Sequence, residues 1–188
     1  TTEWDVSTTQ AYDNSLTVTG QATSPRGITF SPDGLKMYMM GDGSIFSEAV
    51  HQYTLATAWD VFTAVYDNVS HNVSDQDTGP GGITFSPDGF KMYMVGANSN
   101  TIYQYGLTTA WDVSTASFTT GKTKAVSTED FNPRGITFSS DGLKMYMIGS
   151  SNDAIYQYGL TTAWEISPTN VSYSGVSFVI GGQDTAPQ

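Results

Sequence analysis

Residues 27–41 have the sequence GITFSPDGLKMYMMG, and nearly the same fifteen residues return at positions 82–96 and 135–149. The three copies begin 55 and 53 residues apart. Internal repetition at a period of this length is typical of propeller blades, solenoid turns or other arrays. The repetition therefore indicates the fold class before any residue chemistry is considered.

Each copy predicts a β-hairpin. In the first copy, the segment Ser-Pro-Asp-Gly at 31–34 supplies the turn, because proline presets φ and glycine can adopt a positive φ. On the return strand, Met37 and Met39 face one way while Tyr38 and Met40 face the other. Since both faces are apolar, we expect the sheet to be covered on both sides.

A tryptophan marks another fixed point of the repeat. Trp-Asp-Val or Trp-Glu-Ile occurs at Trp4, Trp59, Trp111 and Trp164, and each leads into a Ser/Thr-rich stretch. Four short strands per repeat, turn signals at every junction and no helical periodicity predict an all-β fold, a β-propeller of four-stranded antiparallel blades. We expect a single propeller segment over residues 1–188, with three blades plus a surplus outer strand. The repeats run approximately over 4–58, 59–110, 111–163 and, in part, 164–188.

The hairpin sequence resembles that of known bacterial propellers. Phe-Ser-Pro-Asp-Gly followed by Leu/Phe-Lys-Met-Tyr-Met is similar to the repeats of the YVTN, TolB and NHL-like kind, and the resemblance covers almost the whole chain. It implies that this hairpin forms the two innermost strands of each blade. It implies little about function, because such propellers serve as scaffolds, lectins, lyases, lactonases and dehydrogenases.

Three blades cannot close a ring, since propellers have at least about four. An open arc would leave two apolar blade faces in water, so we expect self-association. Two chains would give a ring of about six blades, a homodimer, with the surplus strand exchanged across the seam or helping to build a mixed seventh blade. Alternatively, the sequence is part of a longer array. The candidates for oligomer contacts are Trp4 and Trp164, near the ends, and Ile45 and Phe46, on a loop three residues longer than its two equivalents.

Composition excludes several classes of function. Eighteen acidic against seven basic residues give a formal charge of −11, which argues against nucleic acid as a partner. The chain has no cysteine and two histidines, so we expect no thiolate or His-rich metal site and no cofactor. No apolar run is long enough to predict membrane insertion. A soluble protein, extracellular or at a cell or virion surface, is consistent with this composition.

The loops at one end of the predicted channel carry the candidate ligand-binding residues. The resemblance places there the outer-to-inner and second-to-third loops of each blade, and a guanidinium beside carboxylates suits a small anion or a glycan. The alternative is that these charged groups pair with neighbouring loops. The candidates are Arg26, Arg134, Asp77, Asp130, Asn98, Asn152 and Asp153.

Near-identical blades present the same side chains in a ring, which suits multivalent binding better than catalysis. The sequence contains no Ser/His/Asp arrangement, phosphate loop or metal cluster. These observations predict a non-enzymatic scaffold or binding module, with glycans as its ligands. The rival hypothesis is a lactonase-like or lyase-like, metal-dependent enzyme centred on the channel.

Overall fold

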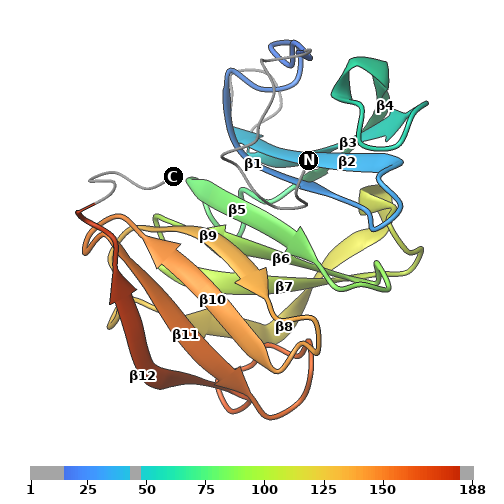
Figure 1. The fold of residues 1–188 in the computed structure, drawn as a ribbon. Coiled ribbons are helices and arrows are strands. Elements are labelled where there is room, and N and C mark those ends of the chain that lie inside the picture. Colours follow the sequence, from blue (N-terminus) through green and yellow to red (C-terminus); the bar gives the residue numbers. More distant parts are fainter. Residues whose placement is uncertain (1–14, 43–47, 183–188) are drawn as a thin grey trace, which may run out of the picture.

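The computed structural model describes residues 15–42 and 48–182 and contains three four-stranded antiparallel sheets (Figure 1). Strand order follows chain order in every sheet, so each sheet is one propeller blade, and the predicted all-β fold of four-stranded antiparallel blades is confirmed. Blade 1 consists of β1 (Ser24–Phe30), β2 (Lys36–Asp42), β3 (Ala49–Leu55) and β4 (Ala64–Asn72). Blade 2 consists of β5 (Pro80–Phe85), β6 (Lys91–Gly96), β7 (Thr101–Leu107) and β8 (Ala116–Ala125). Blade 3 consists of β9 (Pro133–Phe138), β10 (Lys144–Gly149), β11 (Ala154–Leu160) and β12 (Val171–Val179).

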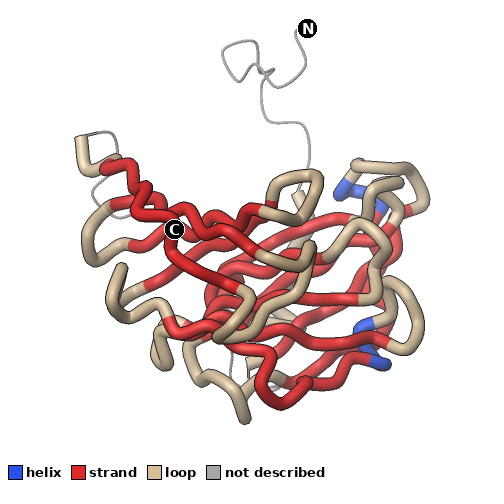
Figure 2. Tube along the Cα trace, turned by 90° about the horizontal axis from the view of Figure 1, so that it is seen from below, coloured by secondary structure: helices blue, strands red, loops and turns tan. Residues whose placement is uncertain are grey.

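Short 3-10 turns, η2 (Val61–Thr63) and η3 (Val113–Thr115), precede the outer strands of blades 1 and 2. Strands dominate the tube drawing, in which these two turns are the helical pieces shown (Figure 2). Most of the surplus outer strand predicted after Trp4 lies outside the described residues, and residues 15–18, at its end, form no strand.

The turn of each inner hairpin is held by its own side chains. In blade 1, the Ser31 hydroxyl donates to the Asp33 carboxylate at 2.6 Å, and that carboxylate accepts from the Leu35 N–H at 3.0 Å. Gly34 adopts a φ of 71°, a conformation that favours glycine. The same contacts recur in blades 2 and 3. Each repeat therefore closes its hairpin locally, before any blade packs on another.

The inner strands β1, β5 and β9 lie side by side around the channel axis. A Cβ added to Gly27 would lie 3.2 Å from the Cα of Gly82, and one added to Gly82 would lie 2.8 Å from the Cα of Gly135. The repeated glycine at the head of each hairpin therefore permits a close approach of successive inner strands.

Apolar side chains fill the two spaces between blades. Tyr38, Met40 and Val50 of blade 1 pack with residues of blade 2, including Ile83 and Met94. An equivalent cluster joins blades 2 and 3. As predicted from the Met and Tyr alternation, both faces of the middle blade are buried.

Two hydrogen bonds recur at each of these interfaces. The Tyr38 hydroxyl donates to the Trp111 carbonyl at 2.6 Å, and the Gln52 side-chain oxygen accepts from the Val113 N–H at 3.0 Å. Between blades 2 and 3 the corresponding bonds run from Tyr93 to the Trp164 carbonyl and from the Ile166 N–H to Gln104. Their lengths are both 2.7 Å. A tyrosine and a glutamine of one blade thus bind the loop between the third and the outer strand of the next blade.

Two partly exposed ion pairs add to the interface of blades 2 and 3. Glu165, in the loop before β12, accepts from Lys91 and Lys122 of blade 2, both at 2.5 Å. Burial works to raise the pKa of Glu165, but the hydrogen bonds from Lys122 and Lys91 outweigh it and hold the pKa below the ordinary value of 4.5. The carboxylate is therefore ionised in the folded protein at neutral pH.

We expect Glu165→Gln to lower the free energy of unfolding at pH 7 by about 1 kcal/mol. Because the folded pKa is depressed, the carboxylate contributes its full stability above the unfolded pKa and loses it as the pH falls through the folded pKa. The difference between the two proteins should therefore shrink below about pH 4.5. Urea unfolding at several pH values measures it, and a difference that is independent of pH would contradict the assignment.

Candidate functional site

The loops at the Gly27 end of the hairpins contain the predicted ligand residues, but two of the carboxylates are occupied by the fold. Asp77 is 4% exposed, and it accepts from the Gly79 N–H and the Ser99 N–H, both at 2.7 Å. A longer contact of 3.4 Å comes from the Asn98 N–H. Asp77 therefore joins the β4–β5 loop to the β6–β7 loop of blade 2.

Asp130 repeats this arrangement in blade 3 with no exposed surface. Its carboxylate accepts from the backbone N–H groups of Asn132 at 2.8 Å, Ser151 at 3.2 Å and Asn152 at 3.0 Å. In the first repeat the equivalent position is Ala22, whose Cβ lies against Gly41. We name Asp77 and Asp130 the loop-binding carboxylates, because their oxygens are directed at backbone donors.

The amide side chains bind neighbouring loops as well. Asn98 donates to the Thr78 hydroxyl at 3.0 Å, and Asn152 donates to the Glu129 carbonyl at 2.9 Å. Both residues are exposed, so they also present polar atoms to solvent at this end of the blades.

The two arginines occupy equivalent places on the inner strands β1 and β9. Arg26 is exposed, whereas Arg134 is half-buried and its Nε donates to the Ser150 hydroxyl at 3.2 Å. These are the only arginines in the sequence. Of the five lysines, Lys36, Lys91 and Lys122 form ion pairs with carboxylates in the described structure.

Asp153 differs from the loop-binding carboxylates. It lies before β11 with a φ of 47°, and its Oδ1 is buried without a hydrogen-bond partner in the described part of the chain. Its backbone carbonyl accepts from the Ile180 N–H at 2.7 Å. The structure thus brings Arg134, Asp130, Asn152 and Asp153 to one end of blade 3, while Asp77 and Asn98 lie on blade 2 and Arg26 on blade 1.

Tyrosines of the third strands bind the entry loops and are not available as bases. The Tyr53 hydroxyl donates to the Gln21 side chain at 3.3 Å, and Tyr105 donates to Gln76 at 3.1 Å. Burial raises the pKa of Tyr53 to about 12 and raises the pKa of Tyr105 further. Both phenols stay protonated at neutral pH, and their role is structural.

Of the candidate oligomer contacts, Trp164 is the one that lies among the described residues. Trp164 lies at the interface of blades 2 and 3, with its ring centroid 5.0 Å from that of Phe138 and 6.4 Å from that of Tyr93. Trp4, Ile45 and Phe46 lie outside the described residues.

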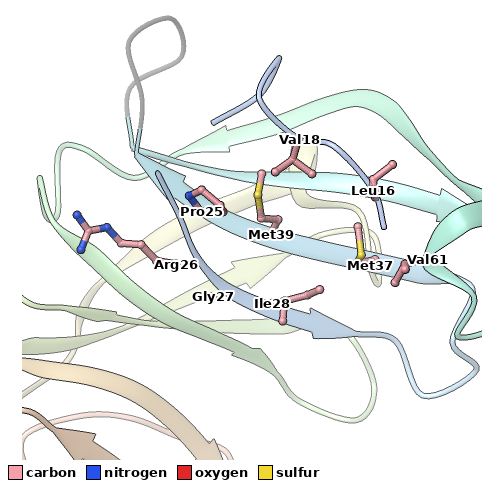
Figure 3. A pocket seen from close by; sticks show the side chains of 9 residues that line it. All are labelled: Leu16, Val18, Pro25, Arg26, Gly27, Ile28, Met37, Met39 and Val61. Atoms are coloured by element: carbon pink, nitrogen blue, oxygen red, sulfur yellow. The ribbon is translucent and has the colours of Figure 1, made fainter. Parts of the chain in front are cut away.

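An apolar cavity of about 360 Å³ on blade 1 was missed by the sequence analysis (Figure 3). Met37 and Met39 form its floor, Leu16 and Val18 approach from the segment before β1, and Ile28 lies at its edge. In blades 2 and 3 the equivalent residues are covered by the preceding blade. The signal for this cavity was present in the two-sided apolar pattern of the hairpin, because no described blade precedes the first copy to cover its Met37 and Met39 face.

Neither a metal centre nor a membrane span is evident in the described part of the chain. Residues 15–42 and 48–182 contain no group of three or more His, Cys, Asp or Glu side chains placed to bind a metal ion. Within the same residues, no helix is both long and apolar enough to cross a membrane.

The fold and the inner-strand geometry define a segment of a β-propeller. Comparison with known protein families finds no match, and comparison with curated proteins finds none either. Solved structures with the same arrangement do exist. A candidate 6-phosphogluconolactonase from Bacteroides fragilis is similar with a TM-score of 0.57 at 14% identity, over 83% of this chain and 39% of its own. A second candidate 6-phosphogluconolactonase, from Bacteroides uniformis, gives 0.55 at 15% identity over 81% and 42%. The periplasmic gluconolactonase PpgL of Pseudomonas aeruginosa gives 0.50 at 17% identity over 79% and 42%.

These comparisons correct the functional prediction. A non-enzymatic scaffold or glycan-binding module was expected because near-identical blades present identical side chains. Three of the similar structures are named instead as lactonases, two of them as candidates, which favours the lactonase-like alternative over the scaffold. The physical reason for the error is that repeat identity resides in the hairpins, whereas the loops at the channel end differ from blade to blade, as Arg26, Gly81 and Arg134 illustrate.

Proposed function

We propose that this chain forms part of a lactonase-like hydrolase that acts on a small anionic sugar lactone. The observation that carries the proposal is the placement of Arg26 and Arg134 at equivalent positions of β1 and β9, at the channel end, in a chain with a net charge of −11. A guanidinium binds carboxylate or phosphate oxygens in a bidentate manner, so two of them favour an anionic substrate in an otherwise acidic protein.

Lactone hydrolysis places a simple demand on such a site. Water adds to the acyl carbon, the bond from that carbon to the ring oxygen breaks, and the ring oxygen takes a proton, so that a hydroxy acid is released. Negative charge develops on the carbonyl oxygen during the addition. A positively charged donor directed at that oxygen stabilises the transition state more than the substrate.

The carboxylate best suited to accept a proton from the attacking water is Asp153. The loop-binding carboxylates already accept from two or more backbone N–H groups each, whereas the Oδ1 of Asp153 has no partner in the described structure. This oxygen is buried in the described structure, so Asp153 acts as the base once the bound substrate brings water to it.

The proposed site requires further blades. The chain spans about two fifths of the length of the solved lactonase-like structures (39% and 42%), so a full channel includes residues beyond these three blades. We propose that a second copy of the chain supplies them, giving a homodimer of about six blades.

The assay uses 6-phosphoglucono-δ-lactone and glucono-δ-lactone, with the rate corrected for spontaneous hydrolysis. We expect acceleration by the parent protein and a loss of about tenfold in kcat/KM for Arg134→Ala, equivalent to one charge-assisted hydrogen bond in the transition state. Lys124→Ala is the matched removal of a positive charge from outer strand β8, at the outer edge of blade 2 and away from the inner strands that carry the arginines, and it should leave the rate unchanged. Hydrolysis of both lactones at the spontaneous rate, with the protein folded and at high concentration, would refute the proposal.

A further inference from the structure

Blades 1 and 3 each have an apolar face that no other described blade covers. On blade 1 the segment before β1 covers part of this face, so that Met37 and Met39 are only 3% and 4% exposed. The open face of blade 1 comprises Ile28, Phe30, Met37, Met39 and Trp59, and the open face of blade 3 comprises Tyr146, Ile148, Ile155, Gln157, Val176 and Phe178. Ile28 is 58% exposed, whereas its equivalents Ile83 and Ile136 are 5% and 9% exposed. Val176 and Phe178 are 52% and 65% exposed. Neither face is finished by the described residues.

A group of one tyrosine, one phenylalanine and one tryptophan recurs at each interface between blades. A third such group is divided between the two open faces. At the interface of blades 1 and 2, the ring centroid of Tyr38 lies 4.5 Å from Phe85, and Phe85 lies 5.4 Å from Trp111. The next interface repeats the group with distances of 4.6 and 5.0 Å. The third set is divided: Phe30 and Trp59 pack together at 5.3 Å on blade 1, and Tyr146 is on blade 3.

The recurrent hydrogen bonds are divided in the same way. The equivalents of Tyr38 and Gln52 in blade 3 are Tyr146 and Gln157, and among the described residues no further blade follows to bind them. The equivalents of the Trp111 carbonyl and the Val113 N–H are those of Trp59 and Val61, on blade 1. Blade 3 therefore carries the tyrosine and the glutamine of the recurrent pair of hydrogen bonds, and blade 1 carries the backbone groups that such residues bind.

We propose that the open face of blade 3 docks on the open face of blade 1 of a second copy of this chain. Tyr146 donates to the second copy's Trp59 carbonyl, and Gln157 accepts from the second copy's Val61 N–H. Ile148 and Ile155 enter the cavity of about 360 Å³ over Met37 and Met39, as Val95 and Ile102 cover the equivalent methionines inside the chain. The two faces differ, so the contact is head-to-tail, and two such contacts close a ring of two chains.

Charge favours the same pairing. Lys91 binds Glu165 across the interface of blades 2 and 3. The equivalent residues at the proposed seam are Lys144, which is exposed on blade 3, and the second copy's Asp60 on blade 1. Opposite charges therefore face each other in a contact that also buries apolar area.

The seam also affects the proposed site. A Cβ at Gly81 would contact the backbone carbonyl of Arg134, so successive blades bring these two inner-strand positions together. By the same geometry, Arg134 of one copy lies beside Arg26 of the second copy. The seam itself rests on packing alone and does not depend on the proposed hydrolase activity.

Leu16 and Val18 must move when the second copy docks. They cover part of blade 1 where the end of β4, with Val69 and Val73, covers blade 2. In the ring, the end of the second copy's β12 lies over blade 1 where Leu16 and Val18 now lie. This β12 stays in position because it is hydrogen-bonded to β11 of its own blade. Removal of residues 1–18 is therefore expected to tighten association.

The test uses light scattering on the parent chain and on two variants that damage opposite faces, Ile28→Asp and Ile148→Asp. The parent should have the mass of two chains, and each variant alone the mass of one. An equimolar mixture should recover two chains, because each variant keeps the face that the other has lost. One seam holds less tightly than two in a closed ring, so the mixture is measured at high concentration.

Val65→Asp is the matched control, because Val65 is 68% exposed on outer strand β4, away from both faces, and its mass should equal that of the parent. Tyr146→Phe removes one hydroxyl and should weaken association by about 3- to 10-fold per seam. A single-chain mass for the parent at high concentration would overturn the proposal and leave the faces to further blades of a longer chain or to another protein. A double mass unaffected by both aspartates, or folded variants that do not associate when mixed, would overturn it as well.

Discussion

Replacing Asp130 with alanine is expected to lower the free energy of unfolding by about 3 kcal/mol. The carboxylate is fully buried and accepts from three backbone N–H groups, those of Asn132, Ser151 and Asn152. Buried donors that lose their acceptor retain their desolvation cost. The loss should appear in urea unfolding as a lower midpoint with an unchanged slope.

Asp75→Ala is the control for this change, since Asp75 is an exposed carboxylate on the equivalent entry loop of blade 2. Its effect should stay within about 0.5 kcal/mol. If Asp130→Ala is as mild as Asp75→Ala, the three backbone bonds do not stabilise the fold, and Asp130 returns to the set of residues free to bind a ligand.

Trp111→Ala is expected to cost a similar amount, about 3 kcal/mol. The indole covers the turn glycine Gly89 and packs on Phe85 of its own blade, and it also reaches Tyr38 of the blade before. Removal of the ring opens a cavity at a point where two blades meet. Thermal unfolding followed by circular dichroism measures the loss.

Phe131→Ala provides the comparison of an aromatic side chain that is 71% exposed. We expect a change below about 0.5 kcal/mol there. Equal effects for Trp111→Ala and Phe131→Ala would mean that the contact between blades 1 and 2 does not depend on the indole.

The blades could be predicted from the sequence because each hairpin is determined by residues that are close together in the chain. Ser31, Asp33 and Gly34 bind one another within four residues, so the turn needs no distant partner. The alternation of methionine and tyrosine on the return strand likewise depends only on the strand period. Local determinants of this kind can be recognised in a single sequence.

The roles of the channel-end residues could not be predicted in the same way. A carboxylate that binds a ligand and one that binds backbone N–H groups have the same sequence signature, and Asp77 and Asp130 prove to be of the second kind. The part that Trp164 plays in oligomer contacts stays a prediction. Trp164 was chosen for its position near the chain end, whereas the repeated contact joins the tyrosine of one blade to the tryptophan of the next, which leaves Trp59 at the open end.

The alanine at position 22 has a consequence for how such an array can change. A loop-binding carboxylate fixes the length of the loop it holds, because an insertion would carry the backbone N–H groups away from its oxygens. Blades 2 and 3 keep both the carboxylate and the short β6–β7 and β10–β11 loops. The first repeat has Ala22 in place of the carboxylate and a β2–β3 loop three residues longer. Loss of one acceptor thus releases a loop from the repeat and lets it vary in length and composition, which makes this loop the natural place for a repetitive scaffold to acquire, or for an engineer to graft, a segment unlike its neighbours.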